Sequence, residues 1–145
     1  MKTVPEGVVI CSSELIAGQE HAEAVMNQAE RAWAEGLKLA RNGSIDLLMR
    51  ITCRGQIQDA VVLSGLTKAR TIAIFGLANS REDVQNTLNL IQDFVGPMKR
   101  SDELLSLDKD KEVYLRKIHD IPSTLRSDQL VTVLKEKSVL LVFDK

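Results

Sequence analysis

The order of apolar and polar residues predicts a chain of amphipathic helices and short strands. Apolar residues recur every three or four positions over residues 20–35, and the same helical spacing appears in four later segments: 56–65, 80–95, 108–121 and from Ser127 onward. Runs typical of strands occupy residues 8–11, 45–53, 70–75 and 138–143. The sequence therefore predicts a protein of mixed helix and strand, folded as a single domain over residues 1–145.

Residues 45–53 decide the predicted topology. With Leu48 as the exception, their apolar side chains occupy every second position, at Ile45, Leu47, Met49, Ile51 and Cys53. This period of two favours a strand, and a helix capped by Ser44 is the alternative. Two strands at 45–53 and 70–75, joined by a helix at 56–65, form a βαβ unit with parallel strands and a right-handed crossover. We therefore expect an α/β (mixed α+β) fold, in which a small mixed sheet containing this unit is flanked by helices.

The composition excludes several protein classes. Hydrophobic residues make up 44% of the 145 positions and charged residues 27%, a balance typical of globular rather than disordered chains. With 19 basic and 20 acidic residues and only 3% aromatics, the chain lacks the charge and stacking groups of a self-sufficient nucleic-acid module. No apolar run has the roughly 18 residues of a membrane span, and the N-terminus lacks a signal-peptide pattern, so we expect a cytoplasmic location.

The sequence holds no compact catalytic, cofactor or metal motif. Neither a P-loop nor a GxGxxG fingerprint occurs, and no CxxC pair is present. Cys11 and Cys53 are therefore predicted to be free, buried thiols. His21 and His119 lie far apart without metal-ligand spacing, which predicts solvent-facing residues on helix surfaces. We expect no catalytic residue, no metal and no cofactor, and a role in binding.

One local charge feature accompanies the predicted βαβ unit. Four basic residues lie on it or at its ends: Arg50, Arg54, Lys68 and Arg70. Such residues can form a phosphate-contacting surface, or they can simply keep a surface soluble. A different class of function also stays open: a small-molecule-binding or enzymatic domain whose site lies at the C-terminal ends of parallel strands, near residues 53–56 and 76–80.

Several segments together resemble a known family. They are residues 20–33, the block Ile45-Asp46-Leu47-Leu48-Met49-Arg50-Ile51 followed by Gln56-Ile57-Gln58-Asp59-Ala60, the helix at 108–121, and Leu134-Lys135-Glu136-Lys137 running into Val139-Leu140-Leu141. In their order, spacing and apolar pattern, from about residue 8 to 143, they are similar to the kinase-binding small subunit of the KEOPS complex, the PRPK-binding protein (TPRKB) family, in its archaeal form. At residues 52–53 such relatives often carry Ser-Gly, whereas this chain has Thr-Cys.

The resemblance implies an accessory, non-catalytic subunit. Such proteins dock on the atypical kinase/ATPase of KEOPS, the complex that installs threonylcarbamoyladenosine next to the tRNA anticodon, and they help to capture the tRNA 3′ CCA tail. For this chain the resemblance implies a mixed α/β fold, the KEOPS kinase and the tRNA 3′ end as direct partners, the other subunits as indirect partners, and no membrane. The implied tRNA-contacting residues are Arg50, Arg54, Gln56, Lys68 and Arg70.

Overall fold

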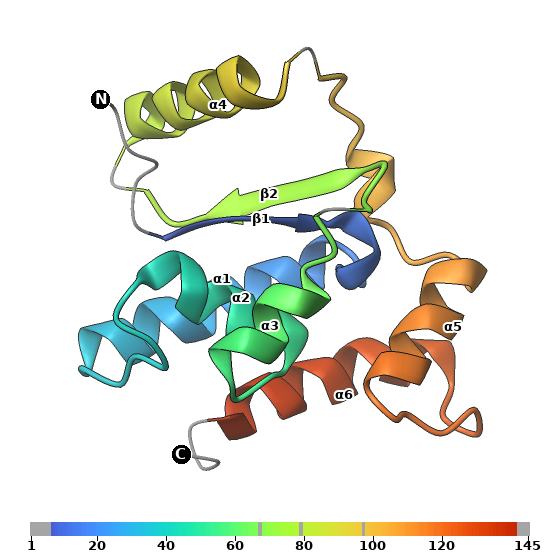
Figure 1. Ribbon diagram of the computed structural model, residues 1–145. Coiled ribbons are helices and arrows are strands. Elements are labelled where there is room, and N and C mark those ends of the chain that lie inside the picture. The colour runs from blue at the N-terminus through green and yellow to red at the C-terminus, as the bar shows by residue number, and fades with distance from the viewer. Residues whose placement is uncertain (1–6, 67, 79, 97, 142–145) are drawn as a thin grey trace.

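A computed structural model describes residues 7–66, 68–78, 80–96 and 98–141 of the chain (Figure 1). Helices and strands are mixed, which confirms the predicted fold class. In chain order the elements are β1 (Val8–Ser12), the short 3-10 helix η1 (Ser13–Leu15), α1 (Gln19–Ala34), α2 (Gly43–Thr52), α3 (Ile57–Leu63), β2 (Ile72–Gly76), α4 (Arg81–Val95), η2 (Asp102–Leu105), α5 (Lys109–Ile118) and α6 (Ser127–Leu140).

The sheet formed by the described residues consists of β1 and β2, which pair antiparallel. The predicted parallel βαβ unit is therefore not observed in this part of the chain. Val8 lies opposite Gly76, where a Cβ atom would stand 2.2 Å from the carbonyl oxygen of Gly7. Only glycine allows the two backbones to approach so closely.

Residues 45–52 lie in a helix, α2, instead of the predicted strand, and Cys53 follows as its C-cap. Asn42 caps it, because its side-chain oxygen accepts hydrogen bonds from the backbone N–H groups of Ser44 and Ile45, at 2.8 and 3.1 Å. Leu48, the exception to the alternation, is buried like its neighbour Leu47. A helix buried on most sides has no polar face, so its apolar spacing alone does not distinguish it from a strand.

The predicted strand at 138–143 is also wrong where the structure describes it. Helix α6 starts at the predicted Ser127 and continues to Leu140, while residues 142–143 lie outside the described residues. Ser138 is fully buried in α6, and its hydroxyl donates to the side-chain oxygen of Gln28 on α1, at 3.0 Å. Packing against α1 thus extends a helix through an apolar run that also suits a strand.

The other α-helices and the strands β1 and β2 lie where the pattern predicts them, whereas the short η1 and η2 were not predicted. Ser80 caps α4 by accepting a hydrogen bond from the backbone of Asp83, and Asp108 caps α5 by accepting one from that of Lys111, at 3.1 and 2.8 Å. The predicted apolar stripe of α1 faces the interior, with Ala22, Val25 and Ala29 buried.

Helices cover both faces of the sheet, but unequally (Figure 1). Helices α1, α2 and α3 lie on one side, and a cluster of buried residues joins the sheet to them; its sheet members are Val9, Cys11 and Ala73. A second cluster joins α5 to α6, through Ala17, Leu115, Ile121, Leu130 and Leu134. None of the helices in the described residues combines the length and the apolar character needed to cross a membrane.

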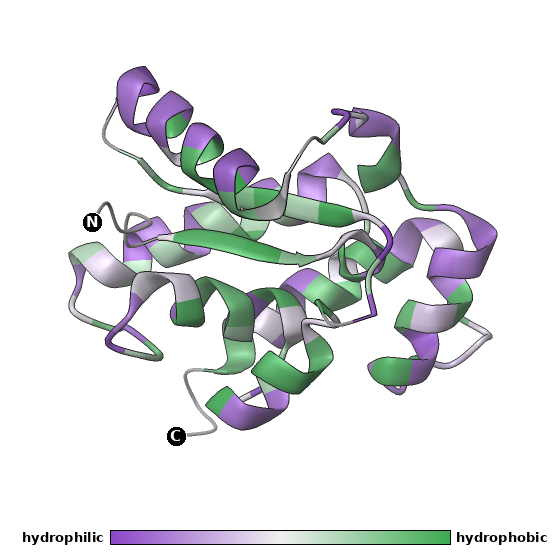
Figure 2. Ribbon diagram, turned by 45° about the horizontal axis from the view of Figure 1, so that its top comes forward, coloured by the Kyte–Doolittle hydropathy of each residue, from purple (hydrophilic) through white to green (hydrophobic). Residues whose placement is uncertain are grey.

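Helix α4 lies over the opposite face of the sheet and is mostly hydrophilic (Figures 1 and 2). Ile91 is buried and Leu88 is half-buried, but Val84 is 48% exposed and Phe94 is 95% exposed. The side chain of Val95 lies outside the described residues. None of the described α4 residues belongs to the buried members of either cluster. This helix is therefore attached more weakly than the others.

Candidate functional site

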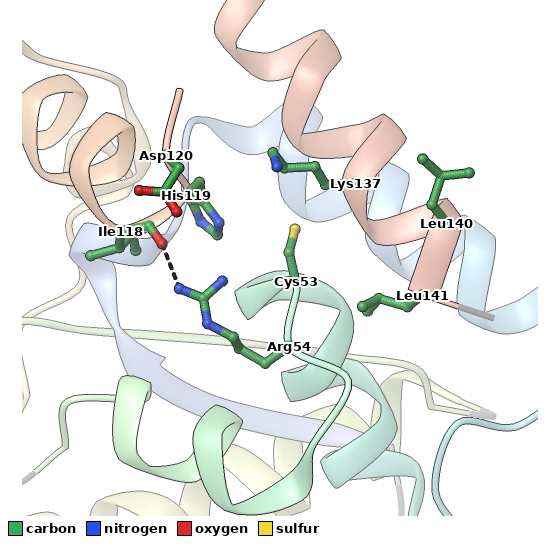
Figure 3. A pocket seen from close by; sticks show the side chains of 8 residues that line it. All are labelled: Cys53, Arg54, Ile118, His119, Asp120, Lys137, Leu140 and Leu141. Atoms are coloured by element: carbon green, nitrogen blue, oxygen red, sulfur yellow. Dashed lines mark hydrogen bonds between the residues drawn. The ribbon is translucent and has the colours of Figure 1, made fainter. Parts of the chain in front are cut away.

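A hollow of about 350 Å³ lies where the C-terminal ends of α2, α5 and α6 meet (Figure 3). We call it the three-helix hollow. Its lining residues are Cys53, Arg54, Ile118, His119, Asp120, Lys137, Leu140 and Leu141. Residues 53–56 were predicted to adjoin a small-molecule site, and the first two of them do line the hollow. The other predicted segment, 76–80, does not contribute to it.

Two lining residues have left-handed backbone conformations. Cys53 has a φ of 53° and Asp120 a φ of 52°, and no other non-glycine residue with positive φ occurs in the described part of the chain. The left-handed region costs a residue with a Cβ about 1–2 kcal/mol. Position 53 is the one where the resemblance sets glycine, the residue that adopts this conformation freely. The hollow is thus bordered by two strained turns.

The two cysteines are free thiols, as predicted. Burial raises the pKa of Cys11 and that of Cys53 to about 12. The Cys53 thiol donates weakly to the carbonyl oxygens of Leu134 and Arg50, at 3.6 and 3.7 Å. A thiol that stays protonated at neutral pH is a poor nucleophile. Cys53 therefore borders the hollow as a neutral group.

His119 is the most unusual lining residue. Its side chain is almost fully buried, with 3% of the residue exposed, and neither ring nitrogen has a hydrogen-bond partner among the described residues. Burial, together with the charges of Arg54, His21 and Lys137, lowers its pKa to about 3. The ring is therefore a neutral imidazole at pH 7, with one N–H donor and one acceptor unused.

The prediction that both histidines face solvent is wrong. His21 is fully buried, its Nδ1 accepts a hydrogen bond from the backbone of Ala17 at 3.0 Å, and burial lowers its pKa to about 4. The sequence contains a signal for this: His21 lies four and eight positions before Val25 and Ala29, and so falls on the buried face of α1. No comparable signal in the sequence predicts that His119 is buried.

Two basic groups reach the hollow from different elements. The Arg54 guanidinium donates to the carbonyl oxygen of Ile118 at 2.5 Å (Figure 3). It also donates to the carbonyl oxygen of Thr52, at 3.2 Å. Lys137 is half-buried and forms no hydrogen bond or ion pair with the described residues. Arg54 thus donates mainly to the backbone, whereas the Lys137 ammonium donates to none of the described residues.

The five residues proposed to contact tRNA do not form one cluster. Arg50 is 4% exposed, and its Nε atom is 2.7 Å from Oδ1 of Asp46. It is therefore buried in an ion pair and does not lie on the surface as expected. Arg54 lines the three-helix hollow. Gln56, Lys68 and Arg70 are exposed outside it, the first before α3 and the other two after it.

Apolar side chains are exposed on α3 and at the end of α6. On α3 and just after it, the exposed residues are Ile57 (51%), Val61 (48%), Val62 (77%) and Leu66 (46%). On α6, Val139 and Leu140 are about half exposed and line a shallow apolar hollow with Lys135 and Glu136. In both places the sequence pattern predicts apolar residues, but not that they face outward.

No group of three or more His, Cys, Asp or Glu side chains in the described part of the chain is placed to hold a metal ion. Comparison of the sequence with protein-family models and with curated proteins finds no match.

Proposed function

We propose that this chain is a non-catalytic regulatory subunit of an archaeal-type KEOPS complex in the cytoplasm. It binds the atypical kinase/ATPase of the complex and the 3′ CCA tail of tRNA, and so supports threonylcarbamoyladenosine modification. The resemblance suggests this role, and the exposed apolar side chains on α3 and α6 are the structural observation that supports it. Side chains of this kind are typical of surfaces that bind a partner.

We assign the kinase-binding surface to the end of α6. Val139 and Leu140 form an apolar floor there, and Lys135 and Glu136 border it with charges of both signs. An apolar centre with a polar border is the usual arrangement of a protein–protein interface. A single apolar side chain of the kinase inserted at this point would bury Val139 and Leu140.

We assign the binding surface for the tRNA tail to the residues around α3. Val61 and Val62 offer apolar contact to bases, while Gln56 precedes this helix and Lys68 and Arg70 follow it in the chain. Basic side chains contact phosphates, and apolar side chains can contact bases. Arg54, two residues before Gln56 in the chain, is a further candidate contact, and Arg50, buried beside Asp46, is left out.

Coexpression with the KEOPS kinase tests the first assignment. The two chains should elute together from a sizing column at micromolar concentration, and Val139→Asp should separate them because it places a charge in the apolar centre. Val113→Asp is the matched control, because Val113 is 66% exposed on α5, outside this surface. Separate elution of the unmodified chains would contradict the proposed function.

Removal of the CCA tail tests the second assignment. Full tRNA should bind, and tRNA trimmed of these nucleotides should not. Lys68→Gln with Arg70→Gln should weaken binding, whereas Lys117→Gln, an exposed position on α5, should leave it unchanged. Equal affinity for full and trimmed tRNA would refute recognition of the tail.

A further inference from the structure

Three nitrogen-bearing side chains converge on the three-helix hollow from three elements (Figure 3). Arg54 follows α2, His119 follows α5 and Lys137 comes from α6. Of these, Arg54 and Lys137 carry positive charge, and neither forms an ion pair with a described carboxylate. Asp120 also lines the hollow, but its side chain is exposed and forms no ion pair with them. Among the side chains that line the hollow, two are therefore cationic and one, the exposed Asp120, is anionic.

Stabilisation of the helix C-termini by basic side chains explains only part of this arrangement. Helix C-termini carry partial negative charge and unpaired carbonyl groups, which basic residues commonly satisfy. Arg54 does this when it donates to Ile118. Lys137 donates to no described carbonyl, and His119 is buried with both nitrogens unpartnered. Buried polar groups without a partner are rare, and they indicate that a ligand or water occupies the adjoining space.

We propose that the three-helix hollow binds the phosphate group of a small phosphorylated molecule, with Lys137, Arg54 and the N–H of His119 as donors. The hollow shares Leu140 with the proposed kinase surface and Arg54 with the proposed tRNA contacts, but the phosphate proposal does not rest on either of those functions.

Geometry favours phosphate over carboxylate. The three side chains approach from three directions, and a tetrahedral phosphate presents oxygen atoms to all of them, whereas a planar carboxylate presents only two. A hollow of about 350 Å³ is larger than one phosphate and falls within the range of small-molecule sites, about 300–1,000 Å³. Leu140 and Leu141 supply an apolar wall for the remainder of the molecule.

The histidine side chains provide a direct readout, because His21 and His119 are the only two in the chain. Labelled full-length protein is titrated with inorganic phosphate at pH 7 and constant ionic strength. The imidazole signals of His119 should shift and saturate, and those of His21 should shift less. Lys137→Gln should weaken binding by about tenfold or more, the loss expected for one charge-assisted hydrogen bond. Lys117→Gln removes the same charge outside the hollow and should bind as the unmodified chain does.

A second titration identifies the source of the phosphate. AMP should bind more tightly than adenosine, because only AMP carries a phosphomonoester. Absence of a saturable His119 shift, equal binding by the Lys137 and Lys117 variants, or equal binding of AMP and adenosine would each overturn the proposal. A CpCpA trinucleotide that shifts the His119 signals when phosphate and AMP do not would also overturn it, in favour of an RNA backbone.

Discussion

The Asp46 carboxylate and the Arg50 guanidinium form an ion pair with side-chain exposures of 0% and 5%. A second oxygen of Asp46 accepts a hydrogen bond from the backbone N–H of Leu39, at 2.6 Å. The pair therefore ties α2 to the segment before it. A buried ion pair adds little net stability, but removal of one partner leaves the other charged and buried.

Asp46→Ala should accordingly destabilise the protein strongly. We expect the free energy of unfolding to fall by about 3–5 kcal/mol, because the Arg50 charge loses its partner. Urea denaturation measures this change. The control is Asp102→Ala, which removes the exposed ion pair between Asp102 and Arg100 and should leave stability unchanged within error. Equal effects of the two substitutions would contradict the burial of the Asp46 pair.

The buried histidines predict a pH dependence of stability. The pKa of His21 is lowered to about 4 and that of His119 to about 3 in the folded protein, chiefly by burial, whereas unfolded histidines titrate near 6.5. Below pH 6.5 the unfolded state therefore binds more protons than the folded state. Stability contributed by the neutral rings is complete above pH 6.5 and is lost as pH falls toward the folded-state pKa values.

We expect the slope of unfolding free energy with pH to reach about 1.4 kcal/mol per pH unit for each histidine below pH 6. Denaturation at a series of pH values gives this slope, and NMR titration gives the protonation state. Neither imidazole should titrate in the folded protein between pH 7 and pH 5. A folded-state midpoint above pH 6 for either ring would show that it is solvated.

At the scale of elements, α2 and α4 differ in how they are held. The side chains of Leu47, Met49 and Ile51 on α2 are at most 1% exposed, whereas α4 contributes no described residue to the buried members of either cluster. Each helix has a polar N-cap, Asn42 and Ser80 respectively. Loss of a cap should therefore have different consequences in the two helices.

Asn42→Ala should lower global stability by about 1 kcal/mol, because α2 unfolds only with the core. Ser80→Ala should leave the global transition nearly unchanged and should increase backbone hydrogen exchange within residues 81–95 alone. Hydrogen exchange followed by mass spectrometry measures both effects on matched peptides. A global destabilisation by Ser80→Ala as large as that by Asn42→Ala would show that α4 folds with the core.

The presence or absence of a polar face explains which helices the sequence could predict. The helix at 19–34 has one polar and one apolar face, so its helical periodicity is visible in the sequence. The capping residues Ser80 and Asp108 mark the starts of two further helices directly. Helix α2 has no comparable polar face. Its local pattern therefore predicts a strand, whereas tertiary packing makes the segment a helix. The three-helix hollow was only partly predictable, because Arg54 gains its neighbours His119 and Lys137 from segments more than sixty residues away.

At the scale of the whole molecule, α6 joins regions that are distant in sequence. Leu130 and Leu134 pack in the cluster shared with α5, while Ser138 bonds to Gln28 on α1. Lys137 reaches the three-helix hollow from the same helix, and Val139 lies on its exposed side. Kinase binding at Val139 and phosphate binding at Lys137 would thus occupy neighbouring positions of one helix, and each substitution can be assayed for both activities.

The balance of charge over the molecule bears on tRNA binding. A net charge of −1 gives no general attraction to a polyanion, so binding must rest on a few local cations. With Arg54, Lys68 and Arg70 as the candidate contacts, the logarithm of affinity should fall with the logarithm of salt concentration with a slope of about −2 to −3. Lys68→Gln and Arg70→Gln should each reduce that slope by about one, whereas Lys117→Gln should not alter it. Filter binding over a salt series measures these slopes. A slope steeper than about −5 for the isolated chain would require phosphate contacts beyond this surface and would contradict the assignment.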